Sequence, residues 1–188
     1  MGERQKMSIG KIFKHFILII KHKYIIFKLC CKAGIPWRGL VHDLSKFSPT
    51  EFFESAKYYV GNHSPITERK KDVGYSDAWL HHKGRNKHHH EYWVDEQASI
   101  KTPVIPYKYA VEMVCDKMAA GIVYKKKEWY KEYQLEYWHR ESKKFETQIN
   151  AKTKEFITQV FIQVAKEGIN KTYTKKNMKN LYTKYCKE

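Results

Sequence analysis

Apolar residues recur with helical spacing along almost the whole chain, and no segment shows the apolar–polar alternation of a half-buried strand. The longest periodic segment, residues 8–32, predicts a single helix that is ended by Gly34 and Pro36. We expect further helices over residues 37–46, 49–60, 76–82 and 106–120, two or three more over 127–188, and a polar loop over 61–74. The sequence therefore predicts an all-α fold.

The length allows one domain with a full hydrophobic core. The 188 residues are 42% hydrophobic and 15% aromatic, which is typical of a folded chain rather than a disordered one. We expect a helical domain over residues 1–125 that carries the functional site, and a helical extension over 126–188 packed on the same domain. The four cysteines form neither a CxxC zinc pattern nor a disulfide framework, which favours a reducing, cytoplasmic location.

The charge of the chain indicates anionic partners. The formal net charge is +16 at pH 7, and such a field attracts phosphates, nucleotides, nucleic acid or an anionic membrane without choosing among them. The longest uninterrupted apolar run in the first helix is Phe16–Ile20, whereas a membrane span needs roughly 20 mostly apolar residues. The charge therefore leaves a small phosphorylated substrate and nucleic acid open as partners, and we expect no membrane partner because no segment could span one.

Histidines and aspartates that suit a metal site occur in five separated stretches. These are His22, His42-Asp43, His81-His82, His88-His89-His90 and Asp116. Imidazole nitrogen and carboxylate oxygen together suit Zn, Mn, Fe or Ni better than an all-oxygen or all-sulfur site does. The sequence therefore indicates a transition-metal centre, provided that the stretches converge.

Each stretch also has a simpler interpretation. A single histidine such as His22 on an apolar helix face is usually a core residue. Asp116 shares its helix face with Met113 and Ala120, where an unpaired carboxylate is costly, so it must meet a metal or a basic side chain or else take a proton. His82 and His89 would lie about 10.5 Å apart along an unbroken helix. Binding of one ion by both therefore requires a bend, for example at Gly84, or else a pair of metals.

The order of these residues resembles the HD-domain superfamily of metal-dependent phosphohydrolases. The dyad His42-Asp43 and the following Lys46 resemble the HD-x-x-K variant of its signature. More narrowly, residues 20–130 are similar to an uncharacterised family of small phage and bacterial proteins, some mislabelled as catalases. The shared segments are 39–49, 74–86 and 111–116. His90 stands where we expect tryptophan in relatives, so it is a poor ligand candidate.

The resemblance implies an HD-like helical bundle and a metal-dependent hydrolase of phosphate esters. It implies one or two ions of Mn, Fe, Zn, Ni or Co, with Asp43 bridging a pair. The ligands that it implies are His22, His42, Asp43, His82, His89 and Asp116, with His81 and His88 as alternatives. Asp43 and Lys46 would be catalytic, and Lys46, Lys83 and Arg85 would contact the phosphate of a substrate such as a nucleotide. If the chain is phage-encoded, it would act in the host cytoplasm.

Two other functions remain open from the sequence. Dinuclear-iron oxygenases share the HD fold and a similar ligand set. The second alternative is a basic nucleic-acid-binding protein, because aromatic residues between 124 and 138 are interspersed with lysines, which suits base stacking and phosphate contacts. The same aromatic spacing also fits a helical core, and that interpretation is favoured.

Overall fold

The structure is a computed structural model that describes residues 6–187. These residues form an all-α fold without strands, which confirms the predicted fold class. None of the described helices is both long enough and apolar enough to cross a membrane. The α-helices are α1 (Ile9–Lys32), α2 (Pro36–Val41), α3 (Pro49–Lys57), α4 (Pro65–Val73), α5 (Asp77–Arg85), α6 (Tyr107–Lys125), α7 (Tyr133–Glu141), α8 (Ala151–Glu167), α9 (Ile169–Thr172) and α10 (Lys175–Tyr182).

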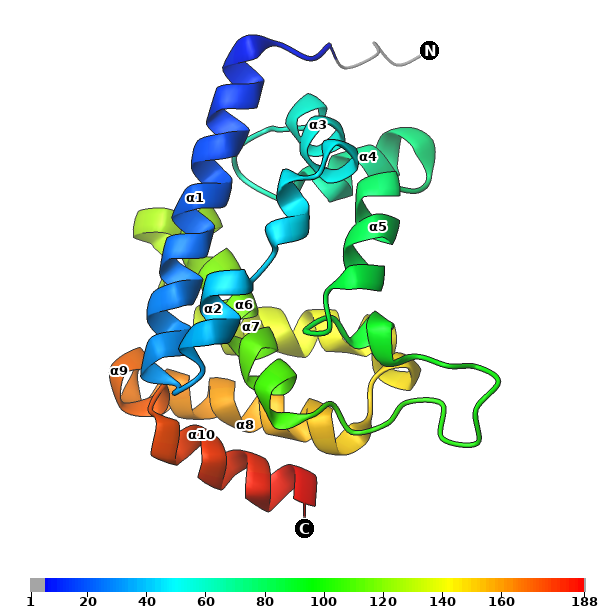
Figure 1. Cartoon of the computed structure of the whole chain (residues 1–188). Coiled ribbons are helices and arrows are strands. Elements are labelled where there is room, and N and C mark those ends of the chain that lie inside the picture. Colours follow the sequence, from blue (N-terminus) through cyan, green and yellow to red (C-terminus); the bar gives the residue numbers. More distant parts are fainter. Residues whose placement is uncertain (1–5, 188) are drawn as a thin grey trace.

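The long helix α1 and the buried helix α6 form the centre of the fold. α1 runs along one side of the molecule and packs against α2, α3 and α6 (Figure 1). α6 is enclosed on nearly all sides, since its buried residues include Ala110, Val114 and Met118. α1 and α6 therefore supply rigid supports on which side chains from distant parts of the sequence converge.

The C-terminal helices share this core. α8 and α10 lie at the opposite end from α3 and α4, and α7 lies between these two ends (Figure 1). Phe156, Phe161 and Tyr173 pack in the same buried cluster as Ile26 of α1 and Met113 of α6. One continuous hydrophobic core thus holds residues from before and after position 126.

Some helix boundaries differ from those predicted. Residues 61–74 contain the helix α4, because Pro65 starts it and Gly74 ends it in the left-handed conformation. α6 continues past Gly121 to Lys125, since Gly121 is buried beside Gln134 and the tertiary contact offsets the weak helix propensity of glycine. The predicted helix 37–46 ends at Val41, and a 3₁₀ turn, η1 (Leu44–Phe47), follows the dyad.

A glycine sets how closely α2 approaches α1. A Cβ atom on Gly39 would lie 2.8 Å from Cys30 Cβ and 3.0 Å from Phe27 Cα. Real Cβ atoms essentially never lie as close as 2.8 Å to another heavy atom, so α2 would have to move away from α1. Since α2 leads directly into His42-Asp43, this close packing fixes the position of the dyad.

We expect opposite effects of alanine at two helical glycines. Gly39→Ala should lower the free energy of unfolding by about 1–3 kcal/mol through overpacking. Gly84→Ala in α5, where a Cβ would meet nothing within 4 Å, should raise it by up to about 1 kcal/mol. Urea denaturation of both variants measures the difference, and a stabilised Gly39→Ala would contradict the close packing of α2.

Candidate metal centre

The helical conformation of the backbone is interrupted at the dyad, and this interruption turns both side chains inward. His42 has φ −54° and ψ 130°, and Asp43 has φ 50° and ψ 33°. Aspartate is among the few residues that adopt this left-handed conformation readily. The ammonium group of Lys23 in α1 donates a hydrogen bond to the His42 carbonyl and so holds the non-helical segment against α1. Both dyad side chains are almost completely buried.

A first group of ligand atoms gathers between α1, the dyad and α6. It consists of His22, His42, Asp43 and Asp116. The Nε2 atom of His22 lies 3.0 Å from Asp116 Oδ1. The Nε2 atom of His42 lies 3.1 Å from Asp43 Oδ2 and 3.6 Å from Asp116 Oδ1. Asp116 therefore faces histidines and not a basic side chain within this group.

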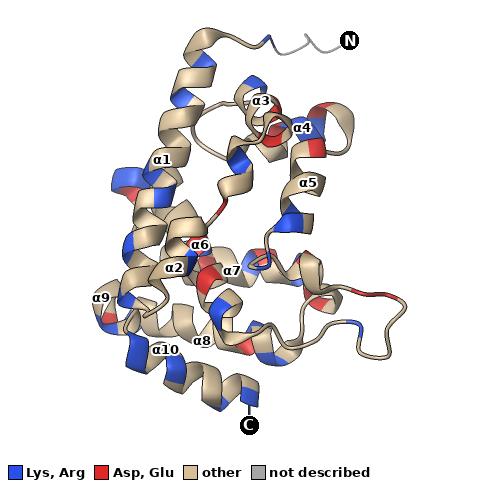
Figure 2. Ribbon diagram, viewed as in Figure 1, with Lys and Arg blue, Asp and Glu red and all other residues tan. Residues whose placement is uncertain are grey.

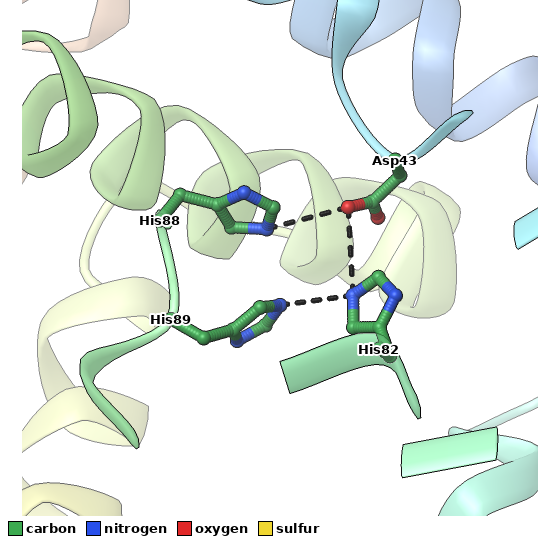
Figure 3. A group of neighbouring side chains, drawn as sticks. All are labelled: Asp43, His82, His88 and His89. Carbon is green, nitrogen blue, oxygen red and sulfur yellow. Dashed lines mark hydrogen bonds and ion pairs between the residues drawn. The ribbon is translucent and has the colours of Figure 1, made fainter. Parts of the chain in front are cut away.

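A second group gathers on the other side of Asp43. It consists of Asp43, His82, His88 and His89, and their side chains point toward one another in Figure 3. The Nε2 atoms of His82 and His88 each lie 3.4 Å from Asp43 Oδ1. The Nε2 atoms of His82 and His89 are 2.9 Å apart. His88 thus joins His89 in the group, whereas the sequence offered it only as an alternative.

The bend that brings His82 near His89 lies after Gly84. α5 continues through Gly84 to Arg85 and ends at Asn86, whose φ of −112° and ψ of 101° are extended. The Asn86 side chain donates to the His82 carbonyl and to the hydroxyl of Ser45. The chain therefore changes direction at Asn86, which is hydrogen-bonded to Ser45 of η1. His88 and His89 follow this change of direction.

The two groups have the spacing and the unpaired atoms of a metal site. Donors held by one ion at about 2.1 Å lie roughly 3.0–3.4 Å apart, which is close to the separations found here. His42 Nε2, His88 Nε2 and Asp43 Oδ1 are buried without a hydrogen-bond partner among the described residues. Buried polar atoms rarely lack a partner, and these three lie around Asp43, so they suit coordination of a divalent cation. These residues fit one or two divalent ions, with Asp43 shared between the groups.

Two buried glutamates orient the histidines. Glu112 Oε1 lies 3.0 Å from His42 Nδ1 and 3.4 Å from His88 Nδ1, while Arg38 Nε lies 2.7 Å from Glu112 Oε2. Glu51 Oε2 lies 2.7 Å from His82 Nδ1. In each case the carboxylate faces Nδ1 and leaves Nε2 directed at the centre. A carboxylate is the usual outer partner of a metal-binding histidine.

The sequence did not assign either glutamate to the centre. Glu51 stands three residues after the N-cap Ser48, a spacing that by itself is typical of a capping box. In the structure Ser48 does cap α3, but the Glu51 carboxylate contacts His82 and His81 instead of returning to the cap. The signal that identifies Glu112 is its place among apolar residues in α6, four residues before Asp116 and on the same helix face.

The electrostatics of the centre follow from burial and mutual contact. Burial alone would raise the pKa of Asp43 and of Asp116, but neighbouring histidines, and Lys46 beside Asp43, hold both pKa values well below their usual range. Burial and the nearby His88 and His82 lower the pKa of His89 well below its usual value. The carboxylates are therefore ionised and His89 is neutral, which are the protonation states that metal binding requires.

A cavity of about 420 Å³ opens beside the ligands. Its lining includes five of the grouped residues together with the basic side chains of Lys46, Lys117 and Lys125. Lys46 Nζ lies 2.7 Å from Asp43 Oδ2, and the pKa of Lys46 is raised by Asp43 and Asp116 against the effect of burial. Neither Lys83 nor Arg85 lines the cavity, and Arg85 is exposed.

The remaining histidines of the tract lie outside both groups. His81 Nδ1 lies 2.6 Å from Glu51 Oε1. His90 stacks on Phe145, with ring centroids 4.2 Å apart. Burial, with Lys117 and Lys83 nearby, lowers the pKa of His90 to about 3. Neither residue contributes an atom to the two groups of candidate ligands described above.

The aromatic residues between 124 and 138 do not form one exposed stacking surface. Trp138 is buried in the core and donates to Thr158. Tyr124, Tyr133 and Tyr137 line the cavity, and Tyr130 is exposed and bonded to Glu136. The helical core spacing noted in the sequence thus accounts for Trp138, and the cavity accounts for the three tyrosines.

The buried His15 on α1 should make stability depend on pH. Burial, with Lys46 nearby, lowers the pKa of His15 from 6.5 to about 4. Between these pH values the unfolded chain binds a proton that the folded chain does not, so stability falls as pH drops from 6.5 to 4. His15→Phe should remove up to about 3 kcal/mol of this loss. Thermal unfolding from pH 7 to pH 4 tests the prediction, and parallel curves for both proteins would contradict it.

The chain matches a protein family described as a family of unknown function, DUF5662, over residues 11–162. The matched part includes every residue of both ligand groups. No match was found among curated proteins or among solved structures.

Proposed function

The chain belongs to the DUF5662 family, whose function is unknown, and we propose that it is a metal-dependent phosphohydrolase of the HD type. The expected substrate is a small phosphorylated molecule such as a nucleotide, cleaved as a phosphomonoester or phosphodiester. The four cysteines are free thiols, which agrees with a cytoplasmic place of action.

The observation that carries the proposal is the shared position of Asp43. One of its carboxylate oxygens faces His42 of the first group, and the other faces His82 and His88 of the second (Figure 3 for the second group). A carboxylate that links two ligand sets is what a two-metal hydrolase needs at its centre. The HD-like order of His22, the dyad, the later histidines and Asp116 supports the same interpretation.

The residues around the cavity supply binding and orientation. A divalent metal ion held by the two groups would polarise a phosphoryl oxygen and lower the pKa of a water molecule. Lys46 presents an ammonium group that is partly exposed beside Asp43, where it can neutralise a phosphoryl oxygen. Lys117 and Lys125 offer further positive charge along the cavity wall. We assign phosphate binding to Lys46 first, and Lys83 and Arg85 require a substrate that extends beyond the cavity.

The test is a hydrolysis screen on protein purified with its metal. Metal content is measured by mass spectrometry, and nucleoside mono-, di-, tri- and cyclic phosphates are supplied as substrates. We expect phosphate release or ring opening for at least one class, with loss of activity after chelation and recovery with Mn, Co, Ni or Zn. A protein with bound metal that hydrolyses none of them would overturn the proposal.

The dinuclear-iron oxygenase alternative uses the same two groups of ligands. Anaerobic purification separates the two functions, because iron with a mixed-valence magnetic resonance signal and no phosphate release favours oxygenation. Strong DNA binding that depends steeply on salt and is unchanged in His42→Ala would instead favour a nucleic-acid-binding role.

A further inference from the structure

The helix α1 carries a second apolar stripe that the fold does not cover. Its core face holds His15, Ile19 and Ile26, whereas large apolar residues spaced by three or four positions follow a different face. The stripe consists of Ile9, Phe13, Phe16, Ile20, Tyr24 and Phe27. Ile9 is 86% exposed, Phe13 65% and Tyr24 62%. A stripe of this length on one helix is larger than the scattered exposed residues of an ordinary surface.

Apolar side chains of the next elements extend the stripe into a surface. Trp37 and Leu40 of α2 are 68% and 54% exposed. α2 packs along α1, with Gly39 in close contact with Phe27. The ring of Phe47 in η1 packs edge-on against Phe16. We call the stripe, together with Trp37, Leu40 and Phe47, the α1 surface.

The cations beside this surface have no acidic neighbours on α1. The helix contains six lysines and no aspartate or glutamate, and blue segments recur along it in Figure 2. Lys14, Lys21 and Lys28 are spaced by seven residues and form an exposed row next to the stripe. Among residues 6–187 none of these three forms an ion pair. The α1 surface is therefore apolar, and the row of lysines beside it is uniformly positive.

A groove runs beside the stripe. It has a volume of about 570 Å³ and lies between α1 and the last turns of α6. Its lining includes apolar Ile17, Ile25 and Ile122 and basic Lys14, Lys21 and Lys126. Apolar walls with lysines among them suit acyl chains below an anionic headgroup.

We propose that the α1 surface docks the protein on an anionic lipid bilayer, with α1 lying parallel to the membrane plane. Aromatic and aliphatic residues on one helix face, with lysines beside them, are what an interfacial helix requires. A second copy of the chain is a poor occupant, because it would bring a second row of three lysines close to Lys14, Lys21 and Lys28. Nucleic acid would satisfy the lysines and leave the apolar stripe in water.

Membrane docking is separate from the proposed hydrolysis, and it is an alternative to the expectation, drawn from the sequence, that the chain has no membrane partner. That expectation rested on the lack of a membrane-spanning segment. Adsorption to the interface needs no span, only an exposed apolar face and positive charge.

The test is co-sedimentation of the full chain with phosphatidylcholine vesicles that contain or lack phosphatidylserine. We expect binding only to the phosphatidylserine vesicles. Lys14→Gln/Lys21→Gln/Lys28→Gln should weaken binding on the order of 100-fold, since each lysine near the surface contributes roughly a factor of five. Phe13→Ser/Ile20→Ser should also weaken it at least tenfold, although the charge is unchanged.

Matched controls separate this surface from the overall charge of the protein. Lys166→Gln/Lys176→Gln/Lys179→Gln removes three exposed lysines elsewhere, and Val73→Ser/Ile100→Ser removes two exposed apolar residues elsewhere. Both should keep binding within about twofold. Equal loss in both lysine triples, or no binding by the wild type, would overturn the proposal. A wild-type dimer that Phe13→Ser/Ile20→Ser dissociates would assign the surface to self-association instead.

Discussion

Asp43→Asn should abolish hydrolysis. It should also prevent metal binding by both groups of ligand residues. Asparagine keeps the size of the side chain and tolerates the left-handed backbone at φ 50°, so the local fold should persist. It lacks the negative charge that both ligand groups share and that Lys46 faces. We expect turnover to fall by roughly 10³-fold or more, because metal assistance contributes several kcal/mol to such reactions.

The measurement pairs metal analysis with phosphate release under identical conditions. Asp77→Asn is the matched control, because Asp77 is largely exposed and its one ion pair among residues 6–187 is with Arg69, at 3.5 Å. It should keep the metal content and the activity of the wild type. If Asp43→Asn retained a full complement of metal, the shared carboxylate would not be the centre of the site.

Glu112→Gln should weaken metal binding by about 10–100-fold, although Glu112 is not itself placed to bind the shared centre with Asp43. Glu112 is completely buried and contacts one histidine of each ligand group, His42 and His88. Burial would raise its pKa, but contacts with these histidines and with Arg38 lower it to about 2, so it carries a negative charge. Glutamine removes that charge and the orientation of both imidazoles.

Competition with a chelator measures the affinity, and two further variants sharpen the result. Glu51→Gln should weaken only the group that contains His82, because Glu51 contacts no histidine of the first group. Glu128→Gln, at a glutamate that is 81% exposed, should change nothing. Equal affinity in Glu112→Gln and wild type, with both folded by circular dichroism, would exclude the orienting role.

The local sequence was informative about the helices because their signals are short-range. Ser8, Ser48 and Ser76 each cap the helix that follows, and each side chain accepts a hydrogen bond from a backbone N–H three residues on. Among the boundaries that were wrong, the end of α6 at residue 125 lies where packing outweighs propensity, whereas α4 carries the local start and stop signals of Pro65 and Gly74. The low helix propensity of Gly121 predicts a helix end at this position. Its burial against α7 keeps α6 continuous instead.

The sequence by itself determined the all-α fold and the set of histidines and aspartates from which a metal centre can be built. Only the tertiary structure decided how they divide into two groups, that His88 joins His89, and that Glu51 and Glu112 orient the ring nitrogens. The physical reason is distance along the chain. Glu51 meets His82 across 31 residues and His42 meets Glu112 across 70, and helical periodicity carries no information about such pairings.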